Sequence, residues 1–361
     1  MNTAVFPAVY ADFGAWASGR SATFFLAAEE YLARHREETF VLLWQTRATC
    51  VVGRHQVVQA EVDLDFCRRH NIEVVRRKSG GGAIFSDGNN VMVSLVCGDG
   101  EVAALFRTFG ERLVEALASM GVAAHISGRN DLLLNDGRKF SGHAFYKIGR
   151  RNIVHCTLLY DTDPRLMGGA LRPSREKLAV KGVESVESRV GTLRERLPFG
   201  LDELKTRLRS CLCASALTLS ADDVKEIERI EQTYRTPEHL RGTAVEASLR
   251  LSGRVEGCGE VGFLLDLDGD LIRRVGLSGD FFERAGCDAE PAFDACLRGR
   301  RFNPDDVAAA LALSHPEQTI SGLHKDDILQ ILFQTRDDKN KNNSGKISGF
   351  FQKQILKINQ L

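Results

Sequence analysis

Three consecutive glycines, residues 80–82, lie between two segments predicted to be buried strands. These segments, residues 72–76 (IEVVR) and 91–97 (VMVSLVC), are rich in β-branched and apolar side chains. A run of glycines lets the backbone approach a ligand closely, and its exposed N–H groups can bind a phosphate. The basic residues 76–78 (RRK) directly before it supply positive charge. We therefore favour a ligand-binding loop over a flexible turn with a solvated basic face, although the spacing is not that of a Walker A loop.

The apolar residues around this loop predict a mixture of helices and strands. Residues 22–35 have the character of a helix with Ser21 as its N-cap. Apolar residues keep helical spacing from 101 to 120, where Gly121 follows as a C-terminal cap. Residues 148–151 (IGRR) predict a hairpin turn. Further strands are expected at 41–44, 49–53, 122–127, 131–134, 138–147 and 152–160, and further helices at 201–213 and 221–233.

A second domain is expected after a change in composition near residues 234–237 (YRTP). The segments LRLSG, VGFLLDLDGD and LIRRVGLSG predict a small antiparallel sheet, and helices are expected around 290–298, 304–313 and 325–333. From residue 335 the polar composition is typical of a mobile tail. The predicted fold class is α+β, with a mixed α/β domain over residues 1–235, a smaller α+β domain over 236–334 and a tail over 335–361.

Composition excludes several classes of function. A formal net charge of +0 argues against a general nucleic-acid or membrane-surface binder. No apolar run reaches the roughly 18 residues that a membrane span needs, and the N-terminus lacks the basic-then-apolar order of a secretory signal. The nine cysteines include no CxxC pair, which fits reduced thiols. We expect a cytoplasmic protein with no nucleic-acid and no membrane partner.

Two further segments carry candidate polar groups. Asn130 and Asp131 precede an apolar strand and can orient a sugar or Mg²⁺, although this pair alone favours an Asx turn. Lys139 begins the following strand, where a lone lysine is most often a solvated surface residue. His155 and Cys156 are neighbours on a predicted strand, so their side chains point to opposite faces. This favours a hydrogen-bonded histidine and a core cysteine over a cysteine nucleophile.

Several segments, in order along the chain, together resemble the lipoate–protein ligase family. They are FFLAAEEYLAR, LLWQTRATCVVGRHQ, RRKSGGGAIFSD, GRNDLLLNDGRKFSGHAF, VHCTLLYDTD and KLAVKGVESVESRVGTL. The sequence GLSGDFF and the helices after it resemble the small C-terminal domain of the family. The resemblance spans about residues 24 to 333. It implies a lipoyl/biotin-ligase-like catalytic domain followed by a small accessory domain.

The resemblance also implies a set of site residues. It implies that ATP or lipoyl-AMP contacts Arg77, Gly82, Ala83, Ile84, Phe85, Asn130, Asp131 and Lys139, and that lipoate contacts Gly81, Lys139 and His155. Lys139 would be the central catalytic residue, touching both the lipoyl carbonyl oxygen and the α-phosphate. Lys181 and Arg189 match basic positions near the nucleotide. The metal ligands stay unassigned.

The implied activity uses ATP and Mg²⁺ to convert lipoic acid to lipoyl-AMP, and then transfers the lipoyl group to a lysine of a lipoyl domain. The implied acceptors are 2-oxoacid dehydrogenase E2 subunits and the H protein of glycine cleavage. One alternative is a lipoyl or octanoyl transferase that acts without ATP, since Cys156 stands where a glycine is usual. Biotin ligase is a weaker alternative, because its glycine-rich motif differs from RRKSGGG. An inactive carrier of lipoyl-AMP is disfavoured by the presence of Lys139.

Overall fold

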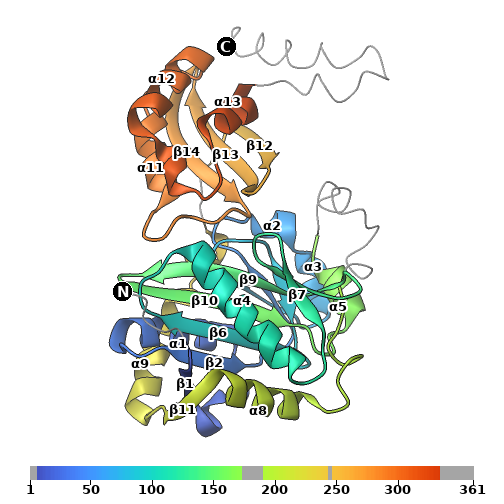
Figure 1. Cartoon of the computed structure of the whole chain (residues 1–361). Coiled ribbons are helices and arrows are strands. Elements are labelled where there is room, and N and C mark those ends of the chain that lie inside the picture. Colours follow the sequence, from blue (N-terminus) through green and yellow to red (C-terminus); the bar gives the residue numbers. More distant parts are fainter. Residues whose placement is uncertain (1–5, 173–189, 243–245, 334–361) are drawn as a thin grey trace. The chain divides into compact units, whose positions relative to one another are not determined.

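An eight-stranded mixed sheet forms the centre of the larger of two compact units (Figure 1). The computed structural model describes residues 6–172, 190–242 and 246–333. Among these residues the strand order is β11-β1-β2-β6-β10-β9-β8-β7. Strand β1 is parallel to both β11 and β2, whereas the other neighbouring strands of this sheet are antiparallel. The strands are β1 (Ala8–Asp12), β2 (Phe40–Trp44), β6 (Val91–Cys97), β7 (Ala124–Ser127), β8 (Asp131–Leu134), β9 (Lys139–Ile148), β10 (Arg151–Leu158) and β11 (Cys213–Thr218).

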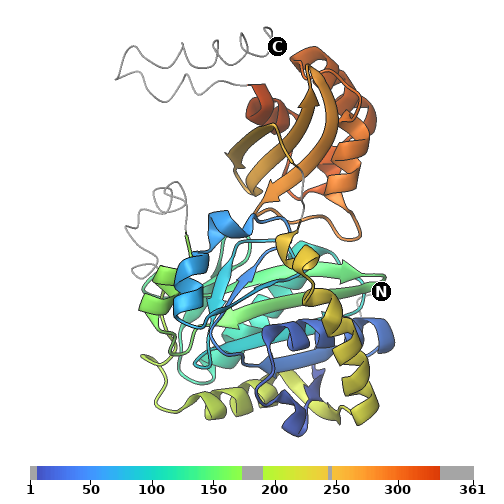
Figure 2. The ribbon, with the colours of Figure 1, turned by 180° about the vertical axis from the view of Figure 1, so that it is seen from behind.

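Helices cover both faces of this sheet. Helices α1 (Ala22–His35) and α9 (Ala221–Tyr234) lie side by side on one face (Figure 2), and α4 (Val102–Ala118) and α8 (Leu201–Leu212) cover the other. Because successive side chains of a strand point to opposite faces of the sheet, they belong to two different hydrophobic cores. On β2, Leu43 packs toward α4 and α8, whereas Trp44 packs toward α1 and α9. Because both faces are covered, the central strands are buried at every position.

A separate three-stranded sheet carries the glycine loop. Its order is β4-β3-β5, made of β4 (Glu73–Arg76), β3 (Thr49–Val52) and β5 (Ile84–Ser86). Strand β3 is parallel to β4 and antiparallel to β5. The loop of residues 77–83 therefore connects two strands that both pair with β3. The short helices α2 (Val58–Glu61), α3 (Leu64–Arg69) and α5 (Pro164–Ala170) contribute to the core beside this sheet.

The smaller unit comprises residues 243–278 and those from 288 onward. Its sheet has the order β12-β13-β14, made of β12 (Leu249–Val255), β13 (Gly259–Asp268) and β14 (Leu271–Gly279). The turn after β13 contains Gly269 at a φ of 61°, a conformation that favours glycine. The helical elements are α11 (Ala289–Leu297), α12 (Pro304–Ser314), the 3₁₀-helix η2 (Pro316–Thr319) and α13 (Lys325–Phe333).

The structure contains most of the helices and strands that the sequence predicts. Strands β1, β5 and β11 were not predicted, nor were α2, α3, α5, α10 (Pro237–Arg241) and the 3₁₀-helices η1 (Gly14–Ala17) and η2. The larger unit continues past the expected boundary at residue 235 as far as Gly242, because α10 packs against β4. It also includes Gly279–Cys287, which follows β14 in the sequence.

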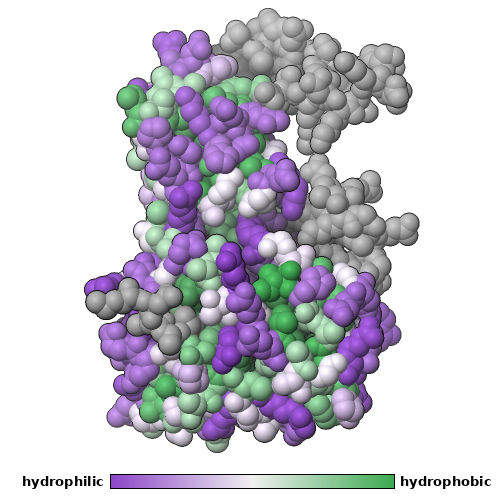
Figure 3. Space-filling model, viewed as in Figure 1, coloured by the Kyte–Doolittle hydropathy of each residue, from purple (hydrophilic) through white to green (hydrophobic). Residues whose placement is uncertain are grey.

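The described surface mixes hydrophilic and hydrophobic residues on the face seen in Figure 3. The large hydrophobic side chains exposed among the described residues are Trp16, Ile126, Leu271 and Leu313, which belong to four different elements. Single exposed apolar side chains of this kind are ordinary. In the described part of the chain, we find no helix with the length and apolar character needed to cross a bilayer.

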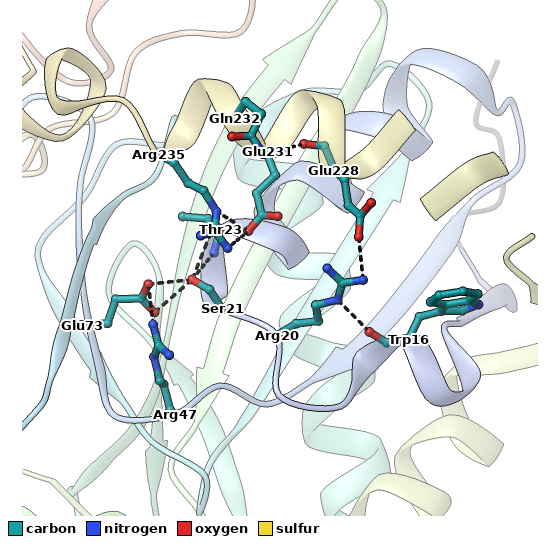
Figure 4. Close-up of polar contacts among 10 residues, drawn as sticks. All are labelled: Trp16, Arg20, Ser21, Thr23, Arg47, Glu73, Glu228, Glu231, Gln232 and Arg235. Carbon is teal, nitrogen blue, oxygen red and sulfur yellow. Dashed lines mark hydrogen bonds and ion pairs between the residues drawn. The ribbon is translucent and has the colours of Figure 1, made fainter. Parts of the chain in front are cut away.

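Polar contacts tie the N-terminus of α1 to α9 and β4 (Figure 4). The Ser21 hydroxyl oxygen accepts a hydrogen bond from the Thr23 N–H at 3.3 Å, as an N-cap does, and donates to the Glu73 carboxylate at 2.9 Å. The Thr23 hydroxyl lies 2.6 Å from the Glu231 carboxylate on α9. These contacts join three segments that are far apart in the sequence and fix where α1 begins.

Replacing Ser21 with alanine should lower the free energy of unfolding by about 1–2 kcal/mol, because it removes both the N-cap and a partner of Glu73. Denaturant unfolding measures the change. Ser210→Ala, on the exposed surface of α8, is the control and should change stability by less than about 0.5 kcal/mol. Equal, small effects in the two variants would show that the cap does not stabilise α1.

Candidate functional site

A cavity lies between the glycine loop, α1 and the sheet face that α1 covers. It holds about 600 Å³ of empty space, a value that includes solvent at its open side. Its apolar lining includes Leu26, Trp44, Val51, Ile84 and Met92. Its polar lining includes Arg77, Asn130, Lys139, His143 and His155. An apolar slot with a few convergent polar groups is the usual form of a small-molecule site.

Most of the site residues predicted from the sequence line this cavity: Arg77, Gly81, Gly82, Ala83, Ile84, Asn130, Lys139 and His155. Phe85 does not, because its side chain is buried in the core of the glycine-loop sheet. Asp131 is not among the lining residues but contacts Lys139. Lys181 and Arg189 lie outside the described residues.

All three members of the basic triplet, residues 76–78, are engaged by the protein itself. The buried Arg76 guanidinium donates to the carbonyls of residues 53, 54, 56, 240 and 241. Burial lowers its pKa to about 10, so it remains charged at neutral pH. The Lys78 ammonium lies 2.6 Å from the Glu30 carboxylate on α1. This corrects the expectation that the whole triplet supplies charge for a phosphate: Arg76 and Lys78 link the loop to its surroundings.

The Arg77 guanidinium fixes the path of the glycine loop from inside. It donates to the carbonyls of Val51 at 3.0 Å, Gly80 at 2.8 Å and Gly82 at 2.8 Å. Burial lowers its pKa to about 10. The loop also passes so close to Gly53 that a Cβ there would lie 2.0 Å from the Gly81 carbonyl oxygen. By contrast, a Cβ at Gly82 would meet nothing within 4 Å, so the loop faces open space there.

Lys139, at the start of β9, places an ammonium beside the cavity. Its Nζ lies 2.5 Å from Asp131 Oδ1 on β8, and 27% of the lysine side chain remains exposed. Gly142 leaves room for it, since a Cβ there would lie 2.7 Å from Nζ. The Asn130 amide, in turn, donates to the His143 carbonyl at 2.7 Å and joins β8 to β9. Lys139 is therefore a partly exposed cation held by one carboxylate.

His143 is a cavity residue that the sequence analysis did not single out. Its ring is buried next to Phe106 and Phe109, and its Nδ1 lies 3.1 Å from the Asn130 carbonyl. Burial lowers its pKa to about 4, so the imidazole is neutral at pH 7. The available signal was a histidine between Gly142 and Ala144 in an otherwise apolar strand.

A buried hydrogen-bond network orients His155. Its Nε2 lies 2.8 Å from the Ser79 hydroxyl, and its Nδ1 lies 3.0 Å from the Glu29 carboxylate on α1. Glu29 also accepts from the Ser94 hydroxyl at 2.5 Å, which accepts from the Trp44 indole at 2.9 Å. Glu29, Ser79, Ser94 and Trp44 were not predicted as site residues from the sequence. An acidic residue inside an apolar helix was the signal that pointed to this network.

Comparison with known proteins finds two families that match along the chain. Residues 21–212 match the family described as Lipoyl protein ligase A/B catalytic domain, and residues 244–332 match the family described as Bacterial lipoate protein ligase C-terminus. Lipoate–protein ligase 1 of Staphylococcus aureus is 32% identical over 283 residues, which is 75% of this chain and 86% of that protein.

The fold is also similar to solved structures. A crystal structure of P. falciparum LipL1 in complex with lipoate has a TM-score of 0.70 at 16% identity, covering 90% of this chain and 97% of that chain. A crystal structure of lipoate-protein ligase A bound with ATP has a TM-score of 0.57 at 21% identity, covering 65% and 98%. At these identities the likeness establishes a shared fold.

Cys156 should resist alkylation in the folded protein. It belongs to the core on the α4 side of the sheet, although it is also among the residues that line the cavity. Burial raises the pKa of its thiol to about 12, so it is neutral at ordinary pH. The exposed Cys211 is the internal control. Mass spectrometry after brief iodoacetamide treatment at pH 8 should find Cys211 modified and Cys156 intact until the protein is unfolded. Modification of Cys156 as fast as Cys211 would contradict its burial.

Proposed function

Because this chain belongs to the lipoate–protein ligase family, we propose that it activates lipoate with ATP and then joins the lipoyl group to a lysine of an acceptor protein. The observation that carries the proposal is a single cavity in which an apolar slot and the Lys139 ammonium lie beside the glycine loop. The slot suits the dithiolane ring and alkyl chain, and the ammonium suits a carboxylate and an α-phosphate.

In the first half-reaction, a carboxylate oxygen of lipoate attacks the α-phosphorus of ATP, and pyrophosphate leaves with the bonding electron pair. Lys139 neutralises charge on both reacting groups, since its side chain is partly exposed and can leave Asp131 for a stronger anion. The N–H groups at Gly82 and Ala83 bind phosphate oxygens from the open part of the loop. Arg77 keeps that loop in shape through its carbonyl contacts.

The remaining site residues position the two substrates. Ile84 packs beside the adenylate, with Phe85 supporting it from the core beneath. Asn130 holds β8 against β9 near the nucleotide. Gly81 and His155 line the part of the cavity that receives lipoate, where His155 is held by Glu29 and Ser79.

In the second half-reaction, the neutral amine of the acceptor lysine attacks the carbonyl carbon of lipoyl-AMP. The Lys139 ammonium stabilises the developing oxyanion, and AMP leaves as the carbonyl re-forms, while the attacking nitrogen gives its proton to solvent. No thiol takes part, consistent with the buried and neutral Cys156. The acceptors are lipoyl domains, such as those of 2-oxoacid dehydrogenase E2 subunits and the glycine cleavage H protein.

Mg²⁺ would enter this site with the nucleotide. In the part of the chain that the structure describes, no group of three or more His, Cys, Asp and Glu side chains can hold a metal ion. This fits Mg²⁺, which commonly binds through substrate phosphates and one or two carboxylates. Asp131, beside Lys139, is a carboxylate near the expected phosphates. We place the reaction in the cytoplasm and assign it to residues 1–235, which lie within the larger unit. We treat residues 236–334, most of which belong to the smaller unit, as an accessory domain.

Incubation of the purified chain with lipoate, MgATP and labelled pyrophosphate, without acceptor, should return label to ATP. Reversible formation of lipoyl-AMP has this consequence, and lipoate must be required for it. A lipoyl or octanoyl transferase that acts without ATP would give no exchange but would still move lipoyl groups from an acylated carrier or from supplied lipoyl-AMP. That result would replace the ligase proposal with the transferase alternative.

Lys139→Ala should slow both half-reactions by about 10²–10³, the effect expected when a pre-placed charge facing developing negative charge is removed. Lys139→Arg should restore little, because a planar guanidinium does not reproduce a compact ammonium. Pyrophosphate exchange and transfer from supplied lipoyl-AMP measure the two steps separately. Lys147→Ala is a matched control, since Lys147 lies on the same strand and pairs with Asp99. Near-normal rates for Lys139→Ala would exclude the assigned role.

A further inference from the structure

The segment Asp280–Glu283, called here the DFFE segment, lies across the glycine loop. It belongs to the same compact unit as the loop, although it follows β14 in the sequence. The Gly81 N–H donates to the Phe281 carbonyl at 3.2 Å. A Cβ at Gly80 would lie 2.5 Å from that same carbonyl oxygen, so the two backbones are in close contact. Two of the three glycines are therefore packed against the DFFE segment.

The groups that contact the DFFE segment are of the kind that binds a phosphate. The Arg54 guanidinium lies 2.8 Å from the Glu283 carboxylate, and 37% of the arginine side chain is exposed. The Arg129 guanidinium lies 3.5 Å from the Asp280 carbonyl and 4.3 Å from the centre of the Phe282 ring. Two arginines and a loop N–H, each now facing a carboxylate or carbonyl oxygen, form an anion-binding arrangement.

The DFFE segment also has the chemical character of a nucleotide. Two aromatic rings lie between two carboxylate residues. The Phe282 ring packs against Gly81, where a Cβ would lie 3.1 Å from it, and against Phe106 at a centroid distance of 5.7 Å. The Phe281 ring stacks on His55 at 4.7 Å. Like a nucleotide, the segment therefore presents aromatic rings beside anionic groups, although both rings are buried here.

We propose that Arg54, Arg129 and the Gly81 N–H form a polyphosphate-binding subsite, and that the DFFE segment is its internal occupant, which ATP or pyrophosphate displaces. This inference rests on the proposed ATP-dependent function and adds a subsite and a competitor to it. A segment that served only to pack the loop would have no need for an ion pair at a partly exposed arginine, since such pairs contribute little to stability.

Two substitutions that break the Arg54–Glu283 ion pair test the proposal; Glu283→Gln also alters the contact of Glu283 with His55 Nε2 at 3.2 Å. Isothermal titration of the full chain with tripolyphosphate, and separately with MgATP, measures the affinity without lipoate. Glu283→Gln weakens the contact between the DFFE segment and Arg54, and should therefore increase the affinity for tripolyphosphate and MgATP about fivefold. Arg54→Gln removes part of the subsite and should weaken binding about tenfold. A purely structural ion pair predicts the same direction of change for both variants, and that outcome, or no change in either, would overturn the proposal.

Further variants control for folding. Glu228→Gln breaks the Arg20–Glu228 pair, which is 2.7 Å long and drawn in Figure 4, and should leave both affinities unchanged. Phe282→Leu keeps an apolar side chain in place while removing the ring beneath Arg129, and should also tighten tripolyphosphate binding. Thermal unfolding of each variant identifies any loss of fold, and looser binding by a folded Phe282→Leu protein would count against the proposal.

The same measurements separate this proposal from the function on which it rests. If the parent chain catalyses lipoate-dependent pyrophosphate exchange but Glu283→Gln and Arg54→Gln shift affinity in the same direction, the subsite proposal fails alone. If the two variants shift tripolyphosphate affinity in opposite directions but the parent shows no exchange, the ligase proposal fails and the subsite stands.

Discussion

The buried guanidinium groups of Arg76 and Arg77 hold the glycine loop in the shape on which the cavity depends. Taking a charged group out of water is unfavourable unless its donors find partners. Arg76 donates to five backbone carbonyls and Arg77 to three, while the buried Arg77 Nε has no hydrogen-bond partner among the described residues. These carbonyls come from β3, from residues 53–56 that follow it, from the loop itself and from the chain at residues 240–241. Residues 80–82 are glycines, which have no side chains to restrict the backbone. The planar guanidinium groups of Arg76 and Arg77 therefore hold the loop in one conformation.

Helix α1 forms the side of the cavity across from the glycine loop, and its buried carboxylates hold it in place. Burial alone would raise the pKa of Glu30, but hydrogen bonds from Lys78 and Arg34 lower it below its ordinary value. The Glu29 carboxylate instead contacts the His155 imidazole and accepts a hydrogen bond from the Ser94 hydroxyl. Because these contacts are buried and charge-assisted, they specify how α1 lies against the sheet and the loop. The N-terminal contacts of α1 in Figure 4 set the start of the same helix.

The sequence predicts what depends on local pattern and misses what depends on distant pairing. Helix α1, the β9–β10 hairpin and the glycine loop follow from spacing, capping and glycine content. Strand β11 (CASALT) is mostly exposed and pairs in parallel with β1, about 200 residues earlier, so no local alternation marks it. A ligand-binding site could be predicted from the glycines, Asn130 and Lys139. The burial of the Arg77 side chain could not, because sequence alone does not say whether a charged side chain points toward backbone carbonyls or toward solvent.

The basic groups of the site divide by burial into two kinds. Arg76 and Arg77 are almost completely buried, and their partners are backbone carbonyls that cannot leave without disrupting the fold. Lys139 and Arg54 are partly exposed, and each faces a carboxylate, Asp131 or Glu283. An incoming anion can replace a carboxylate at such a position, because the exchange conserves charge and the cation is already near solvent. The buried pair therefore maintains the shape of the loop, while the partly exposed cations are those that can exchange partners during a reaction.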